Sequence, residues 1–372
     1  MSLIADFTDK HKERIVGLDI LRSVAILIVV YNHGMNLLPT EFHPTYDAIN
    51  LIRIDGVSIF FVLSGFLIGG ILLKIISTTH FTTKDLINFW IRRWFRTIPN
   101  YMAVLLGILL LRFIFFEDVW SEFNYTYFLF LQNFWAPHPN FFPEAWSLTI
   151  EEWFYLLFPL TCFFFYKIFN SKTKSVLIAA MIFIVFPLVL RIMKFEYGIG
   201  IDEIDREFRK IVLLRLDSLM YGILGAYIVF KHPQFWEKFK YLFLAIGVTF
   251  LFCLYFRWIV FYLPITFNIE SITAFCFLPY LSSLKTTRIK IIDSIFIFIS
   301  IISYSMYLLN HTPIKGFVIP GFNLYTGRAD LPIEETYLLN YTIYWVATLV
   351  GAYILYRFYE NPMTKLRDRV KV

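Results

Sequence analysis

Apolar runs of about 20 residues recur along nearly the whole chain, and a run of this length is what an α-helix needs to cross a bilayer. Hydrophobic residues make up 58% of the 372 positions, more than the interior of a soluble domain can hold. The sequence therefore predicts an all-α, polytopic integral membrane protein with about ten transmembrane helices. The predicted spans are residues 16–38, 57–76, 100–116, 146–168, 175–194, 212–231, 241–260, 264–283, 291–313 and 337–357.

Lysine and arginine residues concentrate in alternate segments between these spans. The positive-inside rule assigns such segments to the cytoplasm, which places both chain termini there. No connecting segment is long enough for a separate domain, so residues 1–372 are expected to form one membrane domain with cytoplasmic tails at 1–15 and 358–372. The expected location is the plasma (inner) membrane, crossed several times. The basic clusters are Lys10, Lys12 and Arg14; Arg92, Arg93 and Arg96; Lys172 and Lys174; Lys238 and Lys240; Lys285, Arg288 and Lys290; and Lys365, Arg367, Arg369 and Lys371.

The first predicted span carries three ionisable residues, Asp19, Arg22 and His33. Arg22 and His33 are about three helical turns apart, so their side chains project from one face, roughly 16 Å from each other along the axis. Asp19 lies one turn before Arg22 on the same face, where an ion pair between them is expected. Ionisable groups inside hydrocarbon are costly and usually mark a functional site.

The predicted topology places further polar groups at the depth of His33. Taken singly, each has a structural interpretation, such as an interhelical hydrogen bond, a carboxylate near a helix N-terminus, or an ion pair between Arg215 and Asp217. Their coincidence in the outer third of several helices favours a functional site. Arg93 and Arg96, in contrast, lie at the inner end of the third span. The polar residues expected at the depth of His33 are Glu151, Glu152, Arg215, Asp217 and His311.

These residue types indicate a chemistry. A histidine with a carboxylate neighbour is suited to general base catalysis on a hydroxyl group, and a pair of arginines is suited to a phosphorylated ligand. The sequence shows no phosphate-binding glycine loop, no zinc-type spacing of His and Cys, and no serine-nucleophile motif. Ser64 has no evident base partner, and with Gly65 it is interpreted as a small pair for close helix packing.

Seven short blocks, in order along nearly the whole chain, resemble the acyltransferase-3 family of integral-membrane O-acyltransferases, which modify surface polysaccharides and related acceptors. Two positions depart from the family pattern. Ile20 replaces a usual glycine, and Ser58 stands where an acid is common, which implies a different contact with the acceptor. The blocks are 17–22 (GLDILR), 60–68 (FFVLSGFLI), 93–96 (RWFR), 146–159 (WSLTIEEWFYLLFP), 215–219 (RLDSL), 303–311 (SYSMYLLNH) and 359–362 (YENP).

The resemblance implies a donor and a site. The donor would be a cytoplasmic acyl-CoA, most simply acetyl-CoA, acting as a co-substrate, and no permanently bound cofactor or metal is expected. Its phosphates would meet Arg93 and Arg96, with the thioester arm passing along the Arg22 side. His33 would deprotonate the acceptor hydroxyl or briefly carry the acyl group, and both roles stay open. Either Glu151 or Glu152 would orient the imidazole. Asp19, Arg215, Asp217 and His311 would contact substrate or support the site.

The expected function is therefore transfer of an acyl group, most simply acetyl, from acyl-CoA to a hydroxyl of an extracytoplasmic or lipid-linked glycan. The expected partners are this acceptor and membrane lipids, without nucleic acid, and self-association or a partner in polysaccharide assembly stays open. One alternative is a transporter of a lipid-linked sugar or small anion, although the broken helices and paired repeats typical of transporters are absent from the pattern. A non-catalytic scaffold is disfavoured by the charges within the spans.

Overall fold

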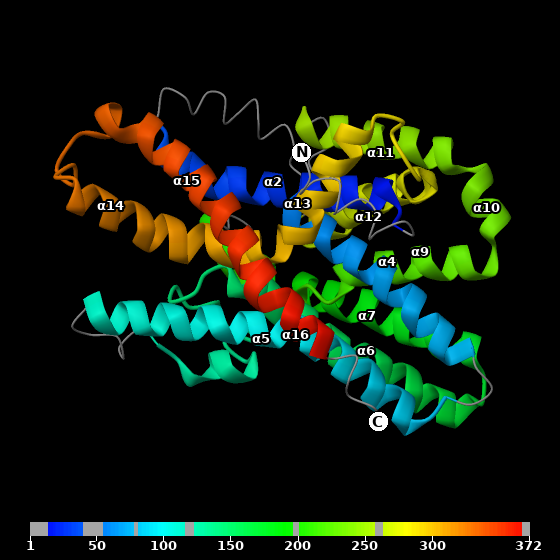
Figure 1. The fold of residues 1–372 in the computed structure, drawn as a ribbon. Helices are drawn as coiled ribbons and strands as arrows, with labels where there is room; N and C mark the ends of the chain where they lie inside the picture. The colour runs from blue at the N-terminus through cyan, green and yellow to red at the C-terminus, as the bar shows by residue number, and fades with distance from the viewer. Residues whose placement is uncertain are drawn as a thin grey trace.

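The computed structural model describes residues 14–39, 55–77, 81–115, 123–195, 201–256 and 263–366. Within these ranges the chain is mostly helical and contains no β-strand (Figure 1). The α-helices are α2 (Val16–Gly34), α4 (Gly56–Ser77), α5 (Thr83–Phe115), α6 (Ala145–Phe169), α7 (Lys172–Lys194), α8 (Ile201–Ile204), α9 (Asp217–Lys231), α10 (Pro233–Lys238), α11 (Lys240–Tyr255), α12 (Leu263–Ser283), α13 (Lys290–Leu309), α14 (Ile319–Tyr325), α15 (Ile333–Leu355) and α16 (Asn361–Leu366).

The predicted all-α membrane architecture is confirmed, and each predicted span overlaps a helix of the structure. Within the described ranges, seven helical stretches are long and apolar enough to cross a membrane. Helices α9 and α11 are shorter, with 15 and 16 residues, and polar residues lower the mean hydropathy of α12. The count of ten spans and the cytoplasmic position of both termini stay predictions. Of the predicted tails, residues 1–13 and 367–372 lie outside the described residues.

The third span is much longer than predicted. The sequence suggests a start at residue 100, but α5 begins at Thr83. The backbone N–H and hydroxyl of Thr82 both donate to the carboxylate of Asp85, and this reciprocal cap stabilises the start of the helix. The apolar run begins later because the first turns of α5 carry arginines, and hydropathy alone does not detect a polar helical segment. Arg93 and Arg96 therefore lie within the helix.

Helices α4 and α9 cross at glycine residues. A Cβ atom added to Gly65 of α4 would lie 1.9 Å from the carbonyl oxygen of Leu219, and one added to Gly222 of α9 would lie 2.0 Å from that of Val62. The two backbones are therefore in direct contact, which is how helices associate in lipid, where van der Waals packing replaces the hydrophobic effect. The close packing predicted at Gly65 is confirmed.

A fully buried ion pair joins α7, α9 and α12. Nη2 of Arg191 lies 2.7 Å from Oδ2 of Asp217, and both side chains have no exposed surface. Asn268 of α12 donates to the same carboxylate oxygen at 2.8 Å and accepts from Arg191 at 2.6 Å. The predicted pairing of Asp217 with Arg215 is therefore wrong. The carboxylate of Asp217 pairs with Arg191 of α7, whose guanidinium lies within hydrogen-bond distance.

The helix crossing predicts a difference between two glycine substitutions in α4. Gly65→Ala should lower the apparent melting temperature in detergent, because its methyl group overlaps a backbone oxygen and overpacking costs about 1–3 kcal/mol. Gly70→Ala is the matched control, since no atom lies within 4 Å of its added Cβ. Equal thermal stability of the two variants would show that the α4–α9 backbones are not in contact.

The buried ion pair predicts that Asp217→Ala acts on folding. The substitution leaves the Arg191 guanidinium unpaired and buried, which costs about 3–5 kcal/mol, so the yield of folded protein in size-exclusion chromatography should fall sharply. Glu207→Ala is the control, because Glu207 pairs with Lys194 at 2.8 Å on the surface and such pairs contribute little. A normal folded yield for Asp217→Ala would contradict a structural role.

Candidate active site

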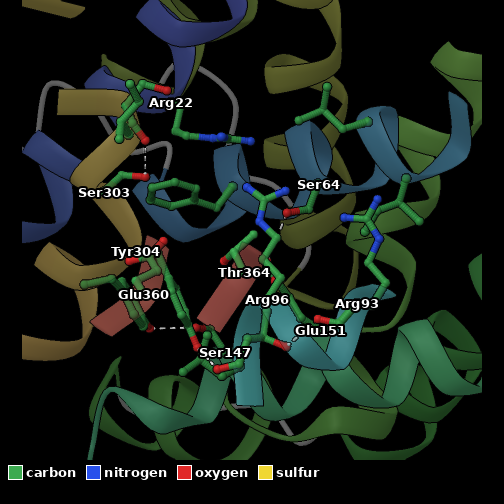
Figure 2. Close-up of a pocket in the computed structure, with 18 of the residues that line it drawn as sticks. Arg22, Ser64, Arg93, Arg96, Ser147, Glu151, Ser303, Tyr304, Glu360 and Thr364 are labelled. Atoms are coloured by element: carbon green, nitrogen blue, oxygen red, sulfur yellow. Dashed lines mark hydrogen bonds between the residues drawn. The ribbon is translucent and has the colours of Figure 1, made fainter. Parts of the chain in front are cut away.

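A cavity of about 320 Å³ lies between α2, α4, α5, α6, α13 and α16 (Figure 2). Its lining is rich in ionisable and hydroxyl side chains, which is unusual for the interior of a membrane domain. The polar lining residues are Arg14, Arg22, Ser64, Arg93, Arg96, Thr97, Ser147, Glu151, Tyr155, Ser300, Ser303, Tyr304, Tyr307, Tyr356, Glu360, Asn361 and Thr364.

The three arginines predicted to bind the donor lie together in this cavity. Arg22 comes from α2, and Arg93 and Arg96 come from α5. Figure 2 shows the guanidinium groups of Arg22 and Arg96 pointing toward the same part of the cavity, beside Ser64. Within the described part of the chain, Arg22 and Arg96 form no hydrogen bond or ion pair. Their donors are therefore available to an anionic ligand.

Glu151 lies in the same cavity and is held by two hydroxyl groups. Ser64 donates to its Oε1 at 3.2 Å, and Tyr155 donates to its Oε2 at 2.8 Å. The interpretation of Ser64 as lacking a base partner is wrong, because the sequence does not show that α4 faces α6. Glu152 does not line the cavity; it is 7% exposed and accepts a hydrogen bond of 2.5 Å from Thr97.

Asp19 supports the cavity wall through a different arginine from the predicted one. It is bound by the guanidinium of Arg14, with Nε at 2.9 Å from Oδ2, and it accepts from Ser300 at 2.6 Å. The expected Asp19–Arg22 ion pair is absent from the interactions of the described residues. Arg14 can reach Asp19 because it precedes the helix, which leaves Arg22 unpaired in the cavity.

His33 lies beyond the cavity, in contact with the segment that follows α13. Its Nδ1 is 2.6 Å from Oδ1 of Asn310, and its ring lies 4.7 Å from that of His311, centroid to centroid. The amide nitrogen of Asn310 donates to the carbonyls of Met306 and Tyr307 at 2.9 and 2.8 Å. Oδ1 of Asn310 must therefore accept, so Nδ1 of His33 carries a proton and Nε2 has the free lone pair.

Asn310 and His311 belong to a π-helical segment, Asn310–Val318, that continues α13. Pro313 lies within it and lacks the N–H that a regular helix would use. The wider turns allow three consecutive residues to contact the site: Asn310 bonds to His33, His311 packs on the same imidazole, and Thr312 reaches a carboxylate. Such π-helical turns occur frequently at functional sites.

The carboxylate beside the histidines is Glu144, which the sequence analysis did not identify. Its side chain is fully buried, and it accepts from the backbone N–H and the hydroxyl of Thr312 at 2.9 and 2.7 Å. Nδ1 of His311 lies 3.6 Å from its Oε2. Burial acts to raise the pKa of Glu144, but His311 and Thr312 outweigh this effect and hold the pKa below its ordinary value. Glu144 is therefore charged at neutral pH.

In the described part of the chain, neither Glu151 nor Glu152 forms a hydrogen bond with His33. The reason is the helical period. Glu144, Ser147 and Glu151 follow one another at spacings of about three to four residues, so they form one stripe along the start of α6. Glu151 lies two turns deeper than the histidines, whereas Glu144 reaches them. This spacing is the sequence signal that identifies Glu144.

A layer of two hydroxyl groups separates the cavity from the histidines. Ser147 Oγ and Tyr307 Oη are 2.6 Å apart, and both residues line the cavity. His33, His311 and Glu144 do not line it. His311 follows Tyr307 by one helical turn, and Glu144 precedes Ser147 by one turn, so the histidine cluster lies about 5 Å beyond the cavity end.

The remaining predicted site residues lie elsewhere. Arg215 is fully buried and donates to Ser58 at 3.0 Å, and Ser58 donates to Glu270 at 3.1 Å. Asp217 forms the ion pair with Arg191 described above. Neither Arg215 nor Asp217 lines the cavity or contacts His33 among the described residues. The structure therefore brings His33 and His311 together but keeps these two residues apart from them.

Comparison with known proteins places the chain in a family. The profile of the Acyl_transf_3 acyltransferase domain matches residues 15–357. O-acetyltransferase OatA of Staphylococcus aureus (strain NCTC 8325 / PS 47) is 30% identical over 382 residues, which cover 94% of this chain and 57% of OatA. The putative O-acetyltransferase SACOL0978 of S. aureus (strain COL) is 29% identical over 400 residues, which cover 98% of this chain and 60% of that relative.

This chain thus spans less than two thirds of the length of these relatives. No solved structure matches it. The family match includes both histidines, Glu144 and the three cavity arginines named above. Because the match extends over nearly the whole chain, this membrane protein belongs to the acyltransferase-3 family, as its seven sequence blocks predict.

Proposed function

We propose that this protein moves an acetyl group from acetyl-CoA, on the cytoplasmic side of the plasma membrane, to a hydroxyl of a glycan or lipid-linked sugar on the outer side. The observation that carries the proposal is a cavity that ends one helical turn from a His–His–Glu cluster and holds two guanidinium groups, Arg22 and Arg96, with no hydrogen-bond or ion-pair partner among the described residues. An acyltransferase family favours transfer chemistry over the transporter and scaffold alternatives. Two relatives that carry the name O-acetyltransferase support acetyl as the group transferred.

The donor half of the proposal rests on the cavity charges. Arg22 and Arg96 bring two positive charges into one cavity, and neither forms a hydrogen bond or an ion pair with the described residues. The phosphates of coenzyme A carry the complementary negative charge, and guanidinium groups bind phosphate oxygens with paired hydrogen bonds. Arg22 and Arg96 would hold the phosphates, with Arg14 and Arg93 lining the same space. The pantetheine arm would extend past Ser64 toward the cavity end.

The acceptor half rests on the protonation of His33. Because Asn310 binds Nδ1–H, Nε2 is free to accept the proton of an acceptor hydroxyl. The hydroxyl oxygen then attacks the thioester carbonyl, the C–S bond breaks, and the coenzyme A thiolate takes the proton back from His33. The negative charge of Glu144, beyond His311, stabilises the imidazolium that forms in between.

The base assignment predicts the effect of His33→Ala. Transfer of radiolabelled acetyl groups from acetyl-CoA in membranes should fall by about 10²–10⁴-fold, the usual contribution of a general base, with unchanged protein levels. Asn32→Ala is the control, because Asn32 is the exposed neighbour of His33 on α2. Undiminished transfer by His33→Ala would eliminate the assignment. A label that stays on the native protein without acceptor, and is lost with His33→Ala, would replace the base role with a carrier role.

The donor assignment predicts that Arg96→Ala raises the KM for acetyl-CoA about tenfold or more, with a smaller change in kcat, because a charged hydrogen bond to phosphate contributes about 1.5–3 kcal/mol. Arg92→Ala is the matched control, since Arg92 is exposed on the same helix and does not line the cavity. Inhibition by coenzyme A should weaken in Arg96→Ala, whereas inhibition by pantetheine, which has no phosphate, should not. Equal loss for both inhibitors would argue against phosphate contact.

A further inference from the structure

The outer end of the cavity is closed by two side chains from different helices. Ser147 of α6 and Tyr307 of α13 are each only 5% exposed, and their hydroxyl oxygens are 2.6 Å apart. Both residues line the cavity, and no residue one turn farther out on either helix does so. This pair, named here the end wall, separates the cavity from the histidine cluster.

The end wall is anchored on the histidine side. Tyr307 donates its hydrogen to the backbone carbonyl of Glu144 at 2.8 Å, so Ser147 must donate its own hydrogen to the Tyr307 oxygen. Glu144 is itself fixed by two hydrogen bonds from Thr312. Movement of the Tyr307 ring therefore breaks a buried hydrogen bond, and an unmade bond of this kind is costly. In this structure the end wall is therefore closed by hydrogen bonds.

The cavity next to the end wall suits a small apolar group. Apolar side chains from α4, α6 and α13 contribute to the lining of the cavity, so a methyl group bound there is removed from water. Each methylene added to the acyl group of the donor would point toward Tyr307, because the end wall closes the cavity in the direction of the histidines. The apolar lining residues are Val57, Phe60, Leu67, Ile68, Leu148 and Ile301.

We infer that the end wall formed by Ser147 and Tyr307 sets the length of the acyl group, so that the protein takes acetyl and excludes acyl chains of four or more carbons. This inference rests on the proposed function, because it assumes an acyl-CoA in the cavity. An acetyl group against the wall leaves its carbonyl about one to two helical turns from His33, so transfer requires the acceptor hydroxyl to pass beside Tyr307. A longer chain would have to displace Tyr307 or withdraw the carbonyl from the histidines.

The test is the ratio of kcat/KM for butyryl-CoA to kcat/KM for acetyl-CoA, measured in membranes with the same acceptor. Tyr307→Ala removes the ring, and Ser147→Gly removes the other half of the wall from a different helix. Both should raise the ratio about tenfold or more, since one or two methylenes in a shaped pocket change specificity by this amount. Tyr307→Phe is the matched comparison: it keeps the ring but loses the hydroxyl that holds it, so the ratio should rise less than in Tyr307→Ala.

The ratio separates a specificity role from damage to the fold. A misfolded fraction lowers transfer from both donors equally and leaves the ratio unchanged, and Ser147→Gly remains available if Tyr307→Ala does not fold. An unchanged ratio in Ser147→Gly and in any folded Tyr307→Ala, with normal acetyl transfer by the native protein, overturns the inference and leaves the proposed function standing. Failure of the native protein to use acetyl-CoA overturns both.

Discussion

The cost of an unpaired charge in an apolar medium organises this structure. Two arginines outside the group that is open to a ligand are paired with carboxylates: Arg191 with Asp217, and Arg14 with Asp19. In the described part of the chain, Arg22 and Arg96 form no such pair, and both line the cavity. Arg22 and Arg96 thus offer hydrogen-bond donors and positive charge to an anionic ligand in the cavity. This contrast, more than the number of charges, distinguishes the site from its scaffold.

Three helices place their polar residues in stripes that face a common axis. Residues about three to four positions apart lie on one helix face, and α2, α6 and α13 all use this spacing. The stripes divide the axis into levels: arginines and Glu151 in the cavity, the Ser147–Tyr307 pair at its end, and the histidines with Glu144 one turn beyond. Figure 1 shows α2 and α13 crossing in the middle of the bundle, where these levels meet. In the proposed reaction, the donor occupies the cavity and the acceptor approaches from the side of the histidines.

Sequence patterns were sufficient wherever one helix carries all of the information. The apolar runs predicted the long helices, and the periodicity of α2 predicted that Arg22 and His33 share a face. Hydropathy patterns did not predict the start of α5 at Thr83, because a polar helical segment precedes the apolar one. Sequence patterns also failed for partners across helices: Arg14 replaces Arg22 beside Asp19, Arg191 replaces Arg215 beside Asp217, and Ser64 meets Glu151. Spacing along one helix does not specify the rotation of its neighbour.

The sequence by itself determined the all-helical membrane fold, the family, and the residues that carry charge within the spans, because length, hydropathy and local blocks are properties of contiguous segments. Only the tertiary structure decided which charges are paired and which remain open to a ligand. It also decided that Glu144, and neither Glu151 nor Glu152, lies beside the histidines. The physical reason is that a hydrogen bond or ion pair depends on distances of a few ångströms between helices, and those distances are set by packing, including the glycine contacts between α4 and α9.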